Sequence, residues 1–158
     1  MNKLIQKKNL LVLYISILCF TLDRFSKLYI LNLAKLQKLD LSITIFLDLR
    51  LIFNKGIAFG MLSVDEAIYY NFITLIIILI TLIVLYMSLI SVGIQKVAFS
   101  MIFGGSTGNI FDRIHYNSVI DFIDVNINGY HWFIFNISDI FITLGVITLI
   151  ILEFYKKK

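Results

Sequence analysis

An apolar run without a single charged residue extends from Ile68 to Val92. It is longer than the ~20 residues that a helix needs to cross the hydrocarbon core of a bilayer. The rest of the 158-residue chain is similar in character, because 59% of the residues are hydrophobic and only 15% are charged. A soluble domain of this length has too little interior to bury so much apolar surface. The sequence therefore predicts an integral membrane protein.

Three further segments have the pattern of membrane helices, at about residues 10–31, 97–111 and 134–152. The first of them follows basic residues, as in a secretory signal peptide, but no small-x-small cleavage site comes after it. We therefore expect an uncleaved span. Together with the run at 68–92, these segments predict one all-α membrane domain over residues 1–158 with four transmembrane helices.

Lysines cluster at both ends of the chain, at positions 3, 7 and 8 and again at positions 156–158. Basic residues are retained on the cytoplasmic side of a membrane, and an even number of spans places both termini there. Lys96 is then expected in a short cytoplasmic turn, with residues near Leu39 and Asn128 outside. The net charge of +4 comes largely from the two ends and forms no patch, so the sequence does not favour nucleic-acid binding.

The two longer connections have strand patterns. Apolar residues alternate with polar ones from Ser42 to Asn54, apart from Phe46 and Ile52, which is typical of a strand. Residues 119–135 are predicted to form two strands joined at Asn128-Gly129, a frequent hairpin turn. Alternation along a strand places Asp121 and Asp124 on opposite faces, so only one of them faces a common site.

Two aspartates lie at the edge of the predicted spans. Asp121 precedes the fourth span, and Asp139 lies inside its first part. An ionisable side chain at this depth is costly and is retained mainly for chemistry or ion handling. Asn136 is three residues before Asp139 and is expected on the same helix face. Because both aspartates approach the same membrane face, we expect them to form one site.

On the third span, small and polar residues share two stripes: Gly105, Gly108 and Asp112 on one, Asn109 and Arg113 on the other. This pattern is compatible with a functional polar cluster and also with close helix packing in which Asp112 and Arg113 are structural. Asp23 and Lys27 are four residues apart in the first span. Their spacing favours a structural ion pair.

Other catalytic classes find little support in the sequence. His115 and His131 both fall in the second outer connection without an HExxH motif, which disfavours a zinc protease. The single cysteine, Cys19, excludes an internal disulfide and a CxxC metal site. No histidine lies in a span beside Ser106, as a serine protease would require. A pair of carboxyls remains, and such a pair works because one group keeps its proton while the other stays anionic.

Five motifs, in order along the chain, resemble those of the lipoprotein signal peptidase (signal peptidase II) family. They are Asp23-Arg-Phe-Ser-Lys27, Asn54-Lys-Gly-Ile-Ala-Phe-Gly60, Gly104-Gly-Ser-Thr-Gly-Asn-Ile-Phe-Asp-Arg113, Val119-Ile-Asp-Phe122 and Phe135-Asn-Ile-Ser-Asp139. The resemblance implies a four-helix bundle with a small extracytoplasmic β-cradle and a short interfacial helix. It also implies an aspartic endopeptidase of the bacterial plasma membrane. Such an enzyme removes the signal peptide from diacylglyceryl-modified prolipoproteins, cutting just before the lipidated cysteine.

The resemblance also assigns roles to individual residues. Asp121 and Asp139 are the catalytic pair; Asn54, Asn109, Arg113 and Asn136 surround the substrate; Asp23, Lys27 and Asp112 support the site. It implies no cofactor and no metal. The expected partners are lipidated prolipoproteins, membrane lipids and inhibitors of the globomycin type, and the expected state is a monomer.

Two residues depart from the family pattern. Ile57 replaces the usual small residue after Gly56, and Ser138 stands where alanine is common, with a hydroxyl that is expected to add a hydrogen bond near Asp139. Two functions from other classes are also compatible with a small polytopic protein. One is an ion-coupled transporter that uses intramembrane aspartates, and the other is an assembly subunit without activity. The first predicts acids along a path across the membrane, and the second leaves Asp139 without a purpose.

Overall fold

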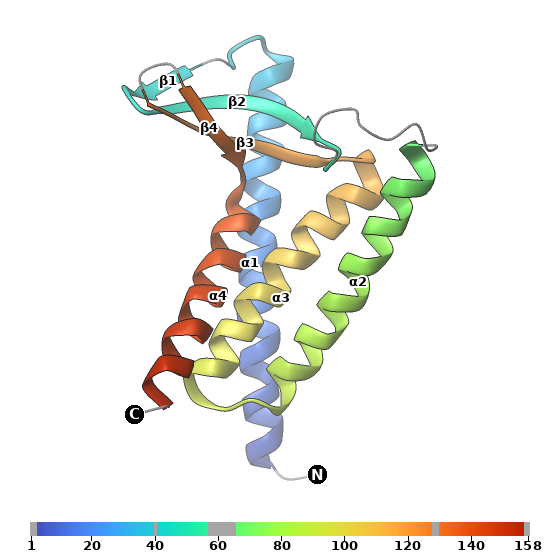
Figure 1. Cartoon of the computed structure of the whole chain (residues 1–158), viewed down its shortest axis with the longest axis vertical. Coiled ribbons are helices and arrows are strands. Elements are labelled where there is room, and N and C mark those ends of the chain that lie inside the picture. The colour runs from blue at the N-terminus through green and yellow to red at the C-terminus, as the bar shows by residue number, and fades with distance from the viewer. Residues whose placement is uncertain (1–2, 40, 57–65, 128–129, 157–158) are drawn as a thin grey trace.

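The computed structural model describes residues 3–39, 41–56, 66–127 and 130–156. These residues form four helices and four strands (Figure 1). The helices are α1 (Lys3–Lys35), α2 (Glu66–Ile90), α3 (Gly93–Tyr116) and α4 (Ile137–Lys156). The strands are β1 (Leu41–Thr44), β2 (Leu47–Asn54), β3 (Val119–Ile127) and β4 (Tyr130–Phe135). The predicted helical protein with a small β-structure is thus confirmed.

The strands form one antiparallel sheet in the order β1-β2-β3-β4, which lies across one end of the helices (Figure 1). The two strands predicted within 119–135 are confirmed as β3 and β4. The single strand predicted over 42–54 is wrong, because the chain turns between β1 and β2. At this turn the Phe46 amide donates a hydrogen bond to the Thr44 hydroxyl, at 3.3 Å.

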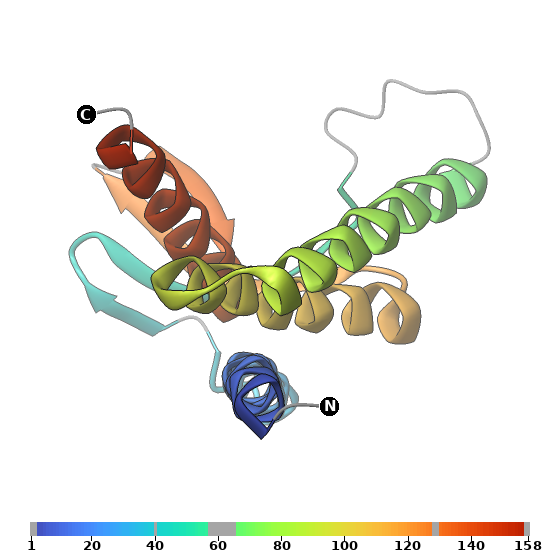
Figure 2. The ribbon, with the colours of Figure 1, turned by 90° about the horizontal axis from the view of Figure 1, so that it is seen from below.

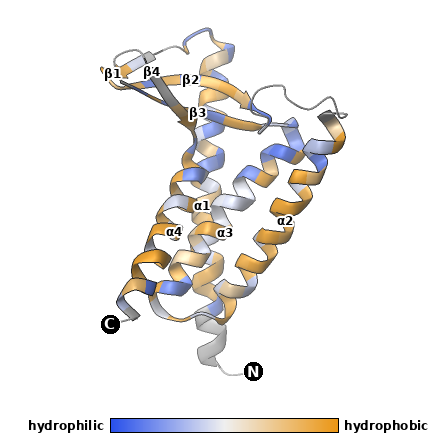
Figure 3. Cartoon of the chain, in the orientation of Figure 1, coloured by the Kyte–Doolittle hydropathy of each residue, from blue (hydrophilic) through white to orange (hydrophobic). Residues whose placement is uncertain are grey.

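The helices expose apolar side chains on their outer surfaces, whereas polar residues gather near the sheet (Figure 3). Within the described residues, three helical segments are long and apolar enough to cross a membrane: Asn9–Lys35, Ala67–Ile90 and Ile137–Tyr155. Exposed apolar surface of this extent is stable in lipid and not in water. The chain is therefore a multi-pass membrane protein. Both termini lie at the end opposite the sheet (Figure 1).

Helix α3 packs against α1, α2 and α4, and the view from below shows α1 and α4 on different sides of it (Figure 2). Glycines make this packing close. A Cβ added at Gly104 would lie 2.7 Å from the Ser16 carbonyl oxygen of α1, and one at Gly105 would lie 2.6 Å from the Ser138 carbonyl oxygen of α4. Small residues therefore bring three helix backbones together, as the stripe on this helix predicted.

The predicted boundaries need correction at each helix. Helix α1 continues beyond residue 31 to Lys35, and α2 begins at Glu66 and ends at Ile90, so Val92 lies outside it. Helix α3 extends beyond 97–111 at both ends, because its polar residues face other helices and not lipid. Lys96 therefore lies within α3 and not in the turn; its ammonium is buried and donates to the carbonyls of Ser88 and Leu89 at the end of α2. His115 likewise belongs to the last turn of α3 and not to the connection after it.

The start of the fourth helix also differs from the prediction. Residues 134–135 belong to β4, and α4 begins only at Ile137. The short interfacial helix implied by the family resemblance does not occur in the described parts of the chain, and residues 57–65 lie outside them.

Candidate active site

Asp139 lies in the first turn of α4, where its backbone and side chain form a reciprocal cap with Asn136. The Asn136 side-chain oxygen accepts from the Asp139 amide, and the Asp139 carboxylate accepts from the Asn136 amide, both at 3.1 Å. This is the geometry of a capping box, which satisfies free amides at a helix start. It fixes the Asp139 carboxylate next to the point where β4 becomes α4.

Asp121 reaches the same place from strand β3. Its two carboxylate oxygens accept hydrogen bonds from two different amides, that of Asn136 at 2.6 Å and that of Asn54 at 2.9 Å. Asn54 is the last residue of β2, and its side-chain oxygen accepts from the Gly56 amide at 2.7 Å. Asn136 thus hydrogen-bonds both aspartates, one through its side chain and the other through its backbone.

Asn109 on α3 completes the contacts around the pair. Its amide nitrogen donates to the Asp139 carboxylate at 2.8 Å. Its oxygen accepts from the Lys27 ammonium at 3.0 Å and from the Asn136 amide at 3.2 Å. Residues from β2, β3, α1, α3 and the start of α4 therefore converge on the two carboxylates, as predicted for one common site.

Burial raises the pKa of Asp121 above its ordinary value, and the negative charge of Asp139 acts in the same direction. Hydrogen bonds from Asn54 and Asn136 and the charge of Lys27 oppose this rise, because each stabilises the anion. The two carboxyls are thus close enough for the charge of one to affect the proton of the other. This relation is what acid–base catalysis by a carboxyl pair requires.

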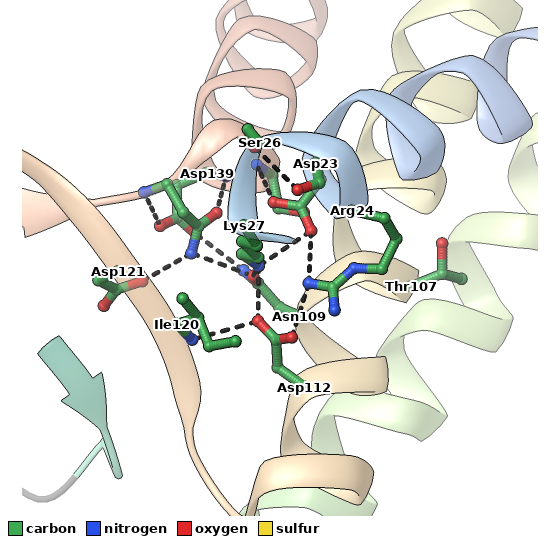
Figure 4. A network of polar contacts seen from close by, with 12 residues as sticks. Asp23, Arg24, Ser26, Lys27, Thr107, Asn109, Asp112, Ile120, Asp121 and Asp139 are labelled. Atoms are coloured by element: carbon green, nitrogen blue, oxygen red, sulfur yellow. Dashed lines mark hydrogen bonds and ion pairs between the residues drawn. The ribbon is translucent and has the colours of Figure 1, made fainter. Parts of the chain in front are cut away.

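A second group of charged residues lies beside the pair, and we call it the ion-pair cluster: Asp23, Arg24, Lys27 and Asp112 (Figure 4). The predicted pair of Asp23 and Lys27 forms, at 2.9 Å. Lys27 also contacts Asp112 at 2.7 Å. Arg24 contacts both acids, Asp23 at 3.0 Å and Asp112 at 2.6 Å. Two positive and two negative charges balance each other, as burial demands.

The sequence analysis assigns no separate role to Arg24. Its position in the helix gives a weak signal, since it is one residue after Asp23 and three before Lys27. The contact that matters joins it to Asp112, far away in the chain. Only the close packing of α1 on α3 brings these residues together.

Arg113 and Asp124 do not contact the two aspartates within the described contacts. The Arg113 guanidinium lies over the Tyr70 ring, at 5.2 Å from its centroid. A Cβ at Gly56 would lie 3.2 Å from it, so Arg113 sits next to the loop that follows Asn54. Asp124 pairs in register with Asp48 across β2 and β3, and its carboxylate lies 3.5 Å from Arg50. Asp121 and Asp124 therefore have separate surroundings, in agreement with strand alternation.

Of the two departures from the family pattern, one can be compared with the structure. The Ser138 hydroxyl is buried and has no hydrogen-bond partner among the described residues, so the expected extra bond near Asp139 is wrong. The Ser138 backbone amide has a partner instead, because it donates to Asp23 at 3.0 Å. Ile57 lies outside the described residues.

An apolar groove of about 240 Å³ opens beside Asp139. Its other lining residues are Phe133, Phe135, Ile140, Thr143 and Leu144. The groove follows the surface where β4 joins α4. An apolar ligand lying in it would be next to the Asp139 carboxylate.

Comparison with known proteins identifies what kind of protein carries this site. The family model described as Signal peptidase (SPase) II matches residues 15–155. The chain belongs to the signal peptidase II family. The lipoprotein signal peptidase of Pelagibacter ubique is 49% identical over 98% of this chain and 94% of its own length. That of Francisella tularensis subsp. mediasiatica is 36% identical over 91% of both chains.

Solved structures agree with this membership. One bacterial membrane enzyme, solved at 2.3 Å, has a TM-score of 0.75 and 32% sequence identity, and the match covers 93% of this chain and 89% of the other. A second, solved at 1.9 Å, has a TM-score of 0.71 and 33% identity over 89% and 90% of the two chains. The family match and these relatives confirm the resemblance seen in the five motifs. A signal peptidase II is a peptidase. The alternative functions, an ion-coupled transporter and an assembly subunit without activity, are therefore not supported.

Proposed function

We propose that this chain is an aspartic endopeptidase that removes the signal peptide from diacylglyceryl-modified prolipoproteins, cutting just before the lipidated cysteine. One observation carries the aspartic part of the proposal: Asn136 hydrogen-bonds both Asp121 and Asp139. Membership of the peptidase family makes a hydrolytic role for this pair the natural one. Purified protein in detergent is expected to cut a lipidated precursor into a free signal peptide and a lipoprotein with an N-terminal cysteine.

The pair performs the reaction as an acid and a base. The anionic carboxylate takes a proton from a water molecule, whose oxygen attacks the scissile carbonyl carbon while the other carboxyl protonates the carbonyl oxygen. The tetrahedral intermediate then collapses: one of its hydroxyls returns a proton to the carboxylate that had donated one as the C=O bond re-forms, the C–N bond breaks, and the proton held by the base passes to the leaving amine. Amides of Asn54, Asn109 and Asn136 hold the carboxylates in place. The apolar groove beside Asp139 suits an apolar part of the substrate.

Membrane topology forms a further part of the proposal. We propose that α3 is a fourth span, that both termini are cytoplasmic and that the sheet and the aspartates lie toward the extracytoplasmic face of the plasma membrane. Polar residues on α3 are compatible with a span because α1, α2 and α4 pack against it. The lysines at both ends favour the cytoplasmic side for the termini.

Cysteine labelling in intact cells provides a matched test of this topology. Lys38 is exposed at the sheet end of α1, and Val92 is exposed in the turn between α2 and α3. In a Cys19→Ala background, which removes the only native thiol, we expect an impermeant maleimide to label Lys38→Cys and not Val92→Cys. Permeabilised cells should label both. Labelling of Val92→Cys alone in intact cells would reverse the proposed orientation.

The pH dependence of cleavage should respond to Asn54. The Asn54 amide stabilises the Asp121 anion and so lowers its pKa, against the raising effect of burial. Removing it in Asn54→Ala should raise that pKa, so that the pair keeps its proton to higher pH. The alkaline limb of the kcat/KM profile is then expected to move to higher pH. Asn126→Ala is the control, because the Asn126 amide donates to Asp48 and not to the pair. If the alkaline limb of Asn54→Ala lay at the same pH as that of the parent, the proposed effect of Asn54 on the pKa of Asp121 would be contradicted.

A further inference from the structure

We propose that Arg24 is a positioning residue for Asp121 and Asp139, acting through the ion-pair cluster that sets the separation of the two carboxylates. This inference rests on the proposed function of the aspartates. The acids of the cluster bind the backbone directly before each of the two aspartates.

Each acid of the cluster holds one backbone amide at the site. Asp23 accepts from the amide of Ser138, the residue before Asp139, at 3.0 Å. Asp112 accepts from the amide of Ile120, the residue before Asp121, at 3.1 Å (Figure 4). The two catalytic aspartates are therefore fixed by the same device, a buried carboxylate that binds the preceding amide. Hydrogen bonds to an ionised acceptor are about twice as strong as neutral ones.

The two basic residues of the cluster connect these two carboxylates. Asp23 is on α1 and Asp112 is on α3. The distance between their carboxylates therefore depends on the positive groups that lie between them. Lys27 contacts one oxygen of each acid, and Arg24 contacts both acids as well. On Asp112 the two contacts are on different oxygens: Lys27 and the Ile120 amide use Oδ2, and Arg24 uses Oδ1. Arg24 thus holds the second oxygen of the Asp112 carboxylate through its charge, since this Oδ1 accepts no hydrogen bond among the described residues.

Arg24 is itself held firmly. Its side chain is only 11% exposed, and its guanidinium lies 4.8 Å from the centroid of the Phe111 ring, one residue before Asp112. Such a cation–π contact restrains a guanidinium on the face of the ring. Without Arg24, two buried carboxylates share one ammonium. One of them would then lack a full positive partner and turn away from the cluster, and its hold on the amide would weaken.

The loss of Arg24 should affect the chemical step more than substrate binding. Arg24 contacts neither Asp121 nor Asp139 in the described contacts, so the carboxyls remain present but misplaced. A shift of about 1 Å in a reacting group lowers the rate on the order of 100-fold. For Arg24→Gln we therefore expect kcat to fall on the order of 100-fold with KM nearly unchanged. Both ion pairs of Arg24 are made by one nitrogen, Nη2. Arg24→Lys, which keeps the charge but loses the planar guanidinium that lies over Phe111, should lie between this variant and the parent.

Arg50→Gln is the matched control. Arg50 also lies near two aspartates, Asp48 at 3.9 Å and Asp124 at 3.5 Å, but its side chain is 46% exposed and neither acid binds an amide next to the pair in the described bonds. This variant is expected to keep the parental kcat. The second comparison is the double variant Arg24→Gln/Asp112→Asn. If Arg24 acts through Asp112, the double variant should lose no more in kcat than the more damaging single variant.

The experiment measures kcat and KM on a lipidated precursor, together with the midpoint of thermal unfolding in detergent, for the parent and these variants. An inactive parent would contradict the proposed function and not the positioning role. With an active parent, the inference is overturned if folded Arg24→Gln retains parental kcat, if Arg50→Gln loses as much, or if the losses of Arg24→Gln and Asp112→Asn multiply. Where Arg24→Gln does not fold, Arg24→Lys takes its place in the same comparisons.

Discussion

Replacing either Asp121 or Asp139 with asparagine is expected to abolish cleavage of a lipidated precursor. In the proposed mechanism the two carboxyls act as one unit, so each single substitution should lower kcat by on the order of 10⁴-fold or more. Asparagine has nearly the same size as aspartate and keeps one of the two oxygens, so one of the two amide bonds to each carboxylate is retained and the other is lost. The protein is therefore expected to remain folded and inserted in the membrane, and the loss belongs to the chemistry.

Asp124→Asn is the control for this prediction. Asp124 lies on the same strand as Asp121 and is fully buried, but its carboxylate is near Arg50 and not near Asn136. The variant should retain substantial activity per folded molecule, which a detergent unfolding curve can verify. Processing by Asp139→Asn at close to the parental rate would show that the aspartic mechanism is wrong.

The sequence predicted those parts of the fold that depend on local pattern. Membrane helices follow from apolar runs that no soluble core could accommodate, and the two paired strands β3 and β4 follow from alternation. The Asp23–Lys27 pair was predictable for the same reason, because one turn of helix brings the two side chains together. The turn predicted at Asn128-Gly129 lies outside the described residues.

Features that depend on tertiary packing were not predictable in this way. The ends of α3 were misplaced because an apolar criterion stops at polar residues, while this helix buries Lys96 and Asp112 against its neighbours. The single strand expected over 42–54 failed at Phe46, where the chain turns although the residue is apolar. Arg24 gained its role only through a contact with Asp112 on another helix.

The candidate site shows the same division. That Asp121 and Asp139 approach one place followed from their depth at the same membrane face. That Asn136 joins them did not follow, because its double contact requires it to be the residue between β4 and α4. The prediction places Asn136 inside a helix that begins at about residue 134, so it does not make Asn136 the residue that caps α4.

The lipid on the substrate is expected to decide whether the enzyme cuts at all. The helices around the site expose apolar side chains, and an apolar groove lies directly beside Asp139. Diacylglyceryl chains resting against such surfaces contribute to affinity at ~0.8 kcal/mol per CH₂ removed from water. A precursor without its diacylglyceryl group should therefore be cut poorly or not at all, although its peptide sequence is the same.

Globomycin, a cyclic peptide antibiotic of the type expected to inhibit this family, gives the same experiment a second arm. We expect it to compete with the lipidated precursor by placing a hydroxyl between Asp121 and Asp139, so that its inhibition weakens as substrate concentration rises. Cleavage of lipidated and unlipidated precursor is measured with and without the antibiotic. Equal cleavage of both precursors, unaffected by globomycin, would contradict the proposed substrate even if the protein were an active protease. In that case the lipid would contribute nothing to substrate binding, and the apolar groove next to Asp139 would not be its binding site.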